Sequence, residues 1–444
     1  MFVNSTTVTV DVFSTTRRRW FVALMLAGLV AVQPASALLC NIDHEPAATL
    51  LFPFFEVNID ECSGPTFADS TALSITNTAP FATIAHVTLW TDWQVPVIDF
   101  DVYLTGYDMQ SINLSDIFCF GILPQTGSAV SPHGPFSGDP IAVPDCNNTP
   151  TSGNGPNYSN PFSAALIELL QEWFTGKQST ILGTCAGSDR GDNIARGYVT
   201  VDVTQECTLL FPRDPAYYSS GVIGFDNILL GEYQYRDSVN NEIRASAPAV
   251  HIEAAPDGFF SDDDHTFYGR YDVDDLGDRR EPLPTTFAAR WTLESRFWIW
   301  REATRDNSPV TCGQSPDWAP LAAPEALFFD NEENLLVVPV DAPNALSTFD
   351  YSGPSSFEGL ALFRLQHDAI EYPDSVAQAW VVREQSFNGN VASYQDAASL
   401  DTACELDTTP VPVAGPSGPL PTSFVIFTDG FESGSTTFWS SVVP

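Results

Sequence analysis

The sequence is poor in basic residues: Lys177 is its only lysine, and 18 Lys and Arg stand against 56 Asp and Glu in 444 residues. The net charge of −38 repels phosphate backbones, which argues against nucleic acids and anionic membrane surfaces as partners. It attracts cations, Ca²⁺ included, although a solvated acidic surface explains the same composition more simply.

The sequence also lacks the short motifs that mark common catalytic and nucleotide-binding sites. It contains no G-x-S-x-G, H-E-x-x-H, P-loop or G-x-G-x-x-G. No C-x-x-C pair occurs, so neither a zinc knuckle nor a thioredoxin-like redox site is predicted. We therefore expect a non-catalytic protein that binds a glycan or a cell-surface partner, or has a structural role. The alternative is a secreted hydrolase that acts on polysaccharide with two carboxylates, but carboxylates are too numerous to name a pair.

The N-terminus carries the pattern of an export signal. Three arginines, Arg17–Arg19, precede twelve small or apolar residues at Phe21–Val32. Ala35-Ser36-Ala37 then gives the small-x-small pattern that signal peptidases cut. The apolar run is too short for a membrane span. We therefore expect residues 1–37 to be a signal peptide, the chain to be exported to the periplasm, the medium or the cell surface, and the mature part to have no membrane span.

Eight cysteines follow the predicted signal: Cys40, Cys62, Cys119, Cys146, Cys185, Cys207, Cys312 and Cys404. An even number in an exported chain predicts four disulfide bonds. Eight cysteines allow 105 connectivities, and the sequence does not choose between them. Sequential pairing is our expectation because it closes mostly short loops: Cys40–Cys62, Cys119–Cys146, Cys185–Cys207 and Cys312–Cys404.

The most regular pattern in the chain lies at Leu73–Phe118, where apolar and polar residues alternate as in strands with one buried face. We expect the polar positions to point outward and to be exposed, namely His86, Thr88, Asp99, Asp101 and Tyr103. Further short strands follow from Arg196, separated by turns rich in Gly, Pro and Asp. The sequence predicts a mainly β fold, an antiparallel β-sandwich of immunoglobulin-like or jelly-roll type.

Composition divides the predicted mature chain into two sandwich domains and shorter segments. A helix over 161–175, with Asn160 as its N-cap and Gly176 as its end, is predicted within the loop-rich insert. The predicted segments are an N-terminal sandwich over 38–125, the insert over 126–195, a second β-rich domain over 196–407, a Pro-rich linker over 408–422 and a tail over 423–444.

The best cation candidate is an acidic loop whose carboxylates alternate before a glycine, as in some calcium loops. Its proposed ligands are Asp272, Asp274, Asp275 and Asp278. The loop has Leu276 where an oxygen ligand belongs and no closing Glu, so a solvated acidic loop is the competing interpretation.

Two weaker candidates involve histidine and tryptophan. A mixed N/O metal site would combine His251 and Glu253 with His265 and the neighbouring carboxylates at 262–264. Trp298 and Trp300 share one strand face, where they would form a sugar-stacking platform or part of the core.

The tail Ile426–Gly434, with Trp439 after it, resembles a short C-terminal motif that recurs on otherwise unrelated secreted bacterial proteins. The body, through LLFPFFEV, HVTLWTDW, FDVYLTGYD and GYVTVDV, resembles a group of secreted bacterial proteins without an assigned activity. The resemblance implies export and sorting or surface display. It implies no catalytic residues.

Overall fold

The computed structural model describes residues 42–63, 68–124, 161–237, 242–260, 265–271, 277–292, 294–304, 306–340, 342–351, 358–368, 377–387 and 390–401. Its strands pair antiparallel, which confirms the predicted mainly β, sandwich-type fold class. The described residues all belong to one compact unit, which ends at Cys404, and the predicted linker over 408–422 and tail over 423–444 lie outside the described residues.

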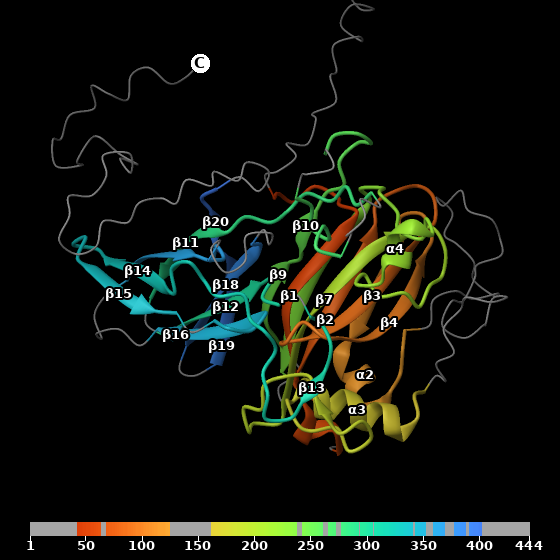
Figure 1. Ribbon diagram of the computed structural model, residues 1–444, viewed down its shortest axis with the longest axis horizontal. Coiled ribbons are helices and arrows are strands. Elements are labelled where there is room, and N and C mark those ends of the chain that lie inside the picture. Colours follow the sequence, from red (N-terminus) through yellow and green to blue (C-terminus); the bar gives the residue numbers. More distant parts are fainter. Residues whose placement is uncertain are drawn as a thin grey trace, which may run out of the picture. The chain divides into compact units, whose positions relative to one another are not determined.

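The largest sheet contains nine described strands (Figure 1). They are β1 Thr49–Asn58, β2 Ser70–Asn77, β3 Thr83–Thr91, β4 Pro96–Leu104, β5 Met109–Asn113, β7 Ile194–Thr204, β8 Leu229–Asp237, β9 Glu242–Pro248 and β10 Val250–Ile252. The order is β4-β3-β7-β1-β2-β8-β9, with β10 beside β1 and β5 beside β2. The domain boundary predicted after residue 195 falls inside β7, a strand of this sheet, so it does not separate two sheets.

Both faces of this sheet are buried over its strands β1, β3 and β7, and the two faces differ in polarity. Alternation places Val87, Val201 and their apolar neighbours on one face, in the main core. His86 and the polar residues aligned with it lie on the other face, and the expectation that they are exposed is wrong: His86, Thr88, Asp99 and Asp101 are all buried. Helix α4 (Pro215–Ser219) and the loops around it cover that face.

Helices α2 (Leu114–Phe120) and α3 (Ala164–Phe174) pack together at one end of the nine-stranded sheet (Figure 1). Helix α3 matches the predicted helix, but its N-cap is Ser163, whose Oγ accepts a hydrogen bond from Leu166 N–H. Helix α2 was expected as strand. Asn113 caps it and Gly121, at φ 65°, ends it, so local capping overrides the alternating pattern there.

Two smaller sheets pack face to face. One has the order β15-β14-β17-β11-β20 and the other β16-β12-β18-β19. Their bounds are β11 Thr286–Trp291, β12 Ser295–Arg301, β14 Glu325–Asp330, β15 Leu335–Pro339, β16 Leu346–Tyr351, β17 Gly359–Arg364, β18 Ala379–Phe387, β19 Asn390–Asp396 and β20 Ala398–Ser399. Ring contacts join the facing surfaces, such as Phe297 with Phe363 at 4.9 Å between centroids.

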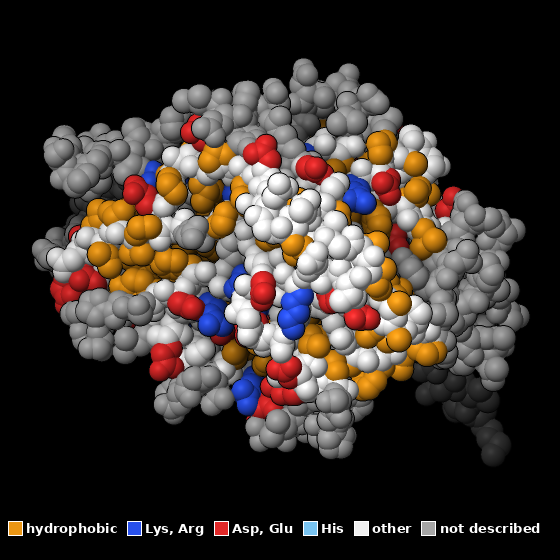
Figure 2. All heavy atoms as spheres, turned by 60° about the horizontal axis from the view of Figure 1, so that its bottom comes forward, with side chains coloured by type: hydrophobic (Ala, Val, Ile, Leu, Met, Phe, Trp, Pro, Cys, Tyr) orange, Lys and Arg blue, Asp and Glu red, His pale blue; other side chains and the backbone are white. Residues whose placement is uncertain are grey.

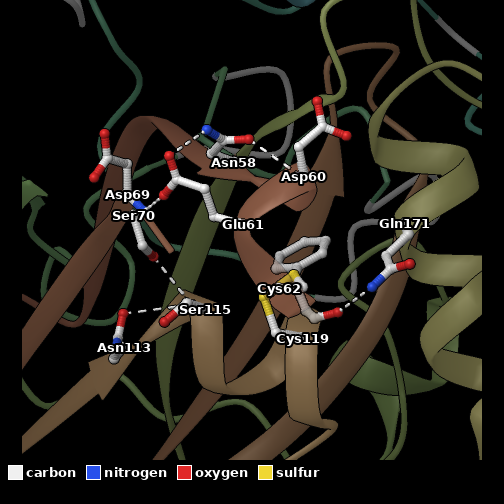
Figure 3. The surroundings of a disulfide bond; sticks show 11 residues. Asn58, Asp60, Glu61, Cys62, Asp69, Ser70, Asn113, Ser115, Cys119 and Gln171 are labelled. Carbon is white, nitrogen blue, oxygen red and sulfur yellow. Dashed lines mark hydrogen bonds between the residues drawn. A yellow bond between two sulfur atoms is a disulfide. The ribbon is translucent and has the colours of Figure 1, made fainter. Parts of the chain in front are cut away.

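The sequential disulfide pairing is wrong at all four bonds. Cys62 pairs with Cys119, and Cys185 pairs with Cys312. The first bond links the 3-10 helix η1 (Ile59–Ser63) to α2 beside Gln171 (Figure 3). The second ties together β6 (Thr184–Cys185) and β13 (Val310–Thr311), which form a two-stranded sheet. Contact between η1 and α2 brings the first pair together, and pairing of β6 with β13 brings the second together. Both contacts depend on topology rather than on distance along the chain.

Cys207 is also disulfide-bonded, and none of the described cysteines is free. Cys40, Cys146 and Cys404 lie outside the described residues.

Candidate functional site

The strongest cluster of chemically competent side chains lies on the polar face of the nine-stranded sheet. Cross-strand register places His86 of β3 directly between Asp101 of β4 and Asp202 of β7. Asp202 in turn lies opposite Thr49 of β1. Four neighbouring strands therefore contribute one continuous row of polar side chains, because directly opposite residues project to the same side of a sheet.

His86 lies between two carboxylates. Its Nδ1 donates to Asp101 Oδ1 at 2.8 Å, and its Nε2 lies 3.7 Å from Asp99 Oδ2. The other carboxylate oxygen of Asp101 accepts the Thr208 N–H at 2.9 Å. The histidine is thus fixed in orientation, with a negative group at each nitrogen.

Asp202 has partners on both of its carboxylate oxygens. Its Oδ2 accepts hydrogen bonds from the hydroxyls of Tyr217, at 2.9 Å, and Tyr268, at 3.0 Å. Its Oδ1 accepts from Thr49 and lies 3.5 Å from Nε of Arg280. These partners come from both layers, the sheet and the loops that cover it, so Asp202 fastens the cover to the sheet.

Arg280 supplies the second cation of the cluster. Its guanidinium contacts Thr49 and Asp202, lies 3.3 Å from Asp278 Oδ1, and donates to the Gly224 carbonyl at 2.9 Å. Asp278 also accepts the Tyr268 N–H at 2.9 Å. Of the four predicted calcium ligands, Asp278 is therefore engaged in internal contacts, whereas Asp272, Asp274 and Asp275 lie outside the described residues.

Burial and charge act against each other in this cluster. Burial lowers the pKa of His86, but the Asp101 hydrogen bond and the charges of Asp101, Asp99 and Asp202 outweigh it, and the pKa is raised. Burial likewise lowers the pKa of Arg280, and its carboxylates raise it above the ordinary value. Burial raises the pKa of Asp278 against the opposing charge of Arg280. The neighbouring carboxylates thus favour the charged forms of both His86 and Arg280.

This cluster has no opening to solvent at its central residues. The side chains of His86, Asp101, Asp202 and Arg280 are each 0% exposed. A carboxylate–histidine pair of this geometry is suited to proton transfer, but a substrate would have to displace the covering loops to reach it. The arrangement as it stands serves to hold those loops.

A cavity of about 20 Å³ lies beside this cluster on the same face, room for a single water molecule. Aromatic rings line most of it, including Trp90, Tyr198 and Trp300. Its polar lining includes Glu302, which forms an ion pair with Arg270 at 2.8 Å and accepts a hydrogen bond from Gln378 at 2.9 Å. Burial raises the pKa of Glu302, and the Arg270 charge opposes this.

A second group of ionisable residues lies around β10. The rings of His44 and His251 are 6.2 Å apart, and His251 Nε2 accepts the Gly231 N–H at 3.1 Å. Burial lowers the pKa of His251 to about 4, aided by His44. Burial raises the pKa of Glu253 to about 7, aided by the charges of Asp43 and Glu45.

The predicted N/O metal site does not assemble among the described residues. They contain no group of three or more His, Cys, Asp or Glu that could hold a metal ion. His265 interacts electrostatically with His367 and Arg270, and burial lowers its pKa to about 3. Its predicted carboxylate partners at 262–264 lie outside the described residues.

The predicted tryptophan platform lies in the core instead. Trp298 is 1% exposed, stacks on Phe54 of β1 at 4.3 Å between ring centroids, and donates its Nε1–H to Glu384 at 2.7 Å. Trp300 is 4% exposed and borders the cavity. No glycan can stack on either ring in this structure, because other side chains already cover both.

The sequence pattern identified His86, Asp99 and Asp101 as an exposed face. It gave Asp202 a place on a strand and paired Arg280 with the acidic loop, as its contact with Asp278 confirms, but it did not bring these residues together in one cluster. The available signal was the alternation on β7, where Tyr198, Thr200 and Asp202 take every second position. On β3, His86 and Thr88 alternate with apolar residues in the same way. Only the register of the two strands shows that these phases lie on one face.

Comparison of the chain with protein-family models, curated proteins and solved structures gave no match. None of the described helices is long and apolar enough to cross a membrane.

Proposed function

We propose that the chain is an exported, disulfide-bonded β protein that acts by binding at its surface, without catalysis. The observation that carries the proposal is the enclosure of its best acid–base cluster, in which His86, Asp101 and Asp202 are 0% exposed and bonded to one another or to the covering loops. Groups placed for catalysis need to reach a substrate. Here they fasten one layer of the protein to another.

Export is part of the same proposal. The signal-like N-terminus and the long-range disulfides both fit an oxidising compartment, in which such bonds persist. The finer location, whether periplasm, medium or cell surface, would follow from fractionation of cells that express the full chain.

Enzymatic assay of the purified full chain tests the non-catalytic proposal. We expect no turnover on a panel of polysaccharides or on general esterase and peptidase substrates. Turnover that a single Asp or Glu substitution abolishes would overturn the proposal, provided that the variant keeps the melting temperature of the parent.

The second candidate is a carboxylate-based hydrolase, and the environment of Glu253 favours it. Hydrolysis by two carboxyl groups needs one of them to stay protonated as the general acid. Glu253, with a pKa of about 7 near the acidic side chains of Asp43 and Glu45, meets this requirement. Glu253 is 6% exposed, and Glu45, whose charge acts on it, is exposed, so this group lies nearer to solvent than the His86 cluster. Loss of activity in Glu253→Gln, but not in Glu45→Gln, would identify this candidate.

A further inference from the structure

The five-stranded sheet ends in a strand with one neighbour. Among the described residues, strand β15 pairs with β14 alone, so in that part of the chain its other side is an open edge. Asp330 N–H donates to Asn334 C=O, and Val340 N–H donates to Pro324 C=O. Antiparallel bonding alternates along a strand, so the even-numbered residues of β15 bond to β14. The odd-numbered residues Leu335 and Val337 therefore direct their N–H and C=O groups toward the open edge.

In the part of the chain that the structure describes, this edge lacks the usual protection against pairing with another chain. Natural edges carry charged side chains, bulges or covering elements. Leu335, Leu336, Val337 and Val338 carry no charge, and the register with β14 is continuous. Pro339 protects the edge only at the last residue of β15, where proline has no backbone N–H to offer to another strand.

The outward face of the same sheet is apolar and exposed. Register aligns Leu335 with Phe329 and Leu360, and Val337 with Leu327 and Leu362. Leu335 is 50% exposed, Val337 44% and Leu360 40%. Figure 2 shows apolar side chains gathered on the side of the molecule where β14 and β15 lie. These six side chains form a stripe, which we name the β15 patch, that continues to the open edge.

Acidic groups stand at one end of the edge. The turn between β14 and β15 contains Asp330, Glu332 and Glu333, and the two glutamates are exposed. Asp330 accepts hydrogen bonds from Asn334 and from Glu332 N–H, and the Asn334 bond holds its pKa below the ordinary value. The turn therefore stays negative at neutral pH, next to Leu335.

We infer that the β15 edge binds an extended polypeptide segment that adds as an antiparallel strand, with apolar side chains on the patch and Lys or Arg at its C-terminal end. Strand addition uses the outward N–H and C=O groups for affinity and alternate side chains for specificity. An antiparallel strand places its C-terminal end beside Leu335 and the acidic turn. The inference rests on the proposed binding function and names the class of partner.

Charge selects this occupant over a second copy of the chain. The protein has a net charge of −38, so two copies repel each other, and their acidic turns would lie at the ends of a shared β15 pair. A basic segment gains from the same field in its approach and in its final position.

The probe is a short synthetic peptide of alternating valine and threonine that ends in two arginines, titrated into the full-length protein by fluorescence anisotropy. We expect saturable binding in the micromolar range, and at least about tenfold weaker binding when the arginines stand at the N-terminal end. Absence of binding to either peptide at millimolar concentration would overturn the inference. It would not decide the non-catalytic proposal, which the enzymatic assay tests separately.

Two variants locate the site. Val337→Pro removes an outward N–H but no bond to β14, and we expect at least about tenfold weaker binding with an unchanged melting temperature. Val337→Thr keeps the donor and should bind within about twofold of the parent. Equal binding by the parent and Val337→Pro would place the peptide elsewhere. Sedimentation of the protein alone tests the other occupant: a dimer that Val337→Pro dissociates would show that a second copy takes the edge.

Discussion

The polar face of the nine-stranded sheet and the outward face of the five-stranded sheet are opposites in composition and in exposure. The first carries His86, Asp101 and Asp202 and is buried under loops. The second carries Leu335, Val337 and Leu360, and these side chains are 40–50% exposed. Polarity and exposure are therefore uncoupled in this protein. Covering elements can satisfy a polar face internally, and an apolar face can remain open where a partner is expected.

The difference also teaches what each face contributes to stability. Ionic groups in a dry interior are costly to bury and very costly to leave unpaired. Exposed apolar groups contribute little to folding, because most of their area stays in water. The polar face should thus respond strongly to substitution, and the β15 patch should respond weakly.

The largest effect is expected for Arg280→Met. The variant leaves Asp202 and Asp278 buried without their cation, so the free energy of unfolding should fall by about 3–5 kcal/mol. Denaturant unfolding followed by tryptophan fluorescence measures the change. The matched control is Arg279→Met, which removes a contact to Asp257, 97% exposed, and should cost less than about 1 kcal/mol. Equal losses in both variants would contradict the comparison.

A smaller effect is expected for His86→Leu, which removes the donor to Asp101 and should cost about 2–3 kcal/mol at pH 6. The pKa of His86 is raised in the fold above its ordinary value of 6.5. Its charged-state stabilisation is therefore complete below pH 6.5 and is lost as the pH rises through the folded pKa. The difference between parent and variant should shrink at alkaline pH, as unfolding curves over a pH series can show. A constant difference would mean that His86 is neutral in the fold.

The next effect concerns Glu253, a buried carboxyl that forms no ion pair with a described residue. Its pKa rises from 4.5 to about 7 in the fold, so the protonated form is favoured and stability falls as the pH rises from 4.5 to about 7. The full shift corresponds to about 3 kcal/mol, and screening by nearby solvent should reduce the loss to on the order of 2 kcal/mol in the parent. Glu253→Gln should flatten this part of the pH profile, whereas Glu45→Gln, an exposed neighbour, should leave it nearly unchanged. If the free energy of unfolding falls equally steeply with pH in both variants, other groups than Glu253 cause the pH dependence.

The smallest effect is expected on the β15 patch. Leu360→Thr should change the free energy of unfolding by less than about 0.5 kcal/mol, because the side chain is 40% exposed. Phe363→Leu on the same strand, at a fully buried position of the opposite face, should cost about 1–2 kcal/mol. Thermal melts of the two variants make the comparison, and a larger loss at Leu360 would show that the patch belongs to the core.

The sequence was a good guide to strands and a poor guide to their surroundings. Alternation in β3, β4 and β7 reflects the geometry of each strand, so it could be read from local sequence. Burial of His86 depends on a cover supplied by residues more than a hundred positions away, such as Tyr217 and Arg280. The disulfide partners depend on the same long-range topology. Local pattern contains neither kind of information.

The same limit applies to the candidate sites. Trp298 and Trp300 were correctly placed on one face of a strand, yet only the position of Phe54 across the interface shows that Trp298 lies in the core. A shift of register inside β1, between Phe52 and Phe55, accompanies that contact. The calcium loop stays a prediction, and a melting temperature that is equal in chelator and in millimolar Ca²⁺ would argue against it.

The bond between Cys185 and Cys312 has a consequence for biosynthesis. A chain made from its N-terminus presents Cys185 first, and its partner follows 127 residues later, about 6–25 s at ordinary rates of synthesis. Cys207 emerges sooner and belongs to a different bond. An oxidant that joins Cys185 to Cys207, the next thiol to emerge, would form a non-native disulfide. Thiol–disulfide exchange must then break that bond before Cys185 can pair with Cys312. Maturation of this protein should therefore depend on an isomerase as well as on an oxidant.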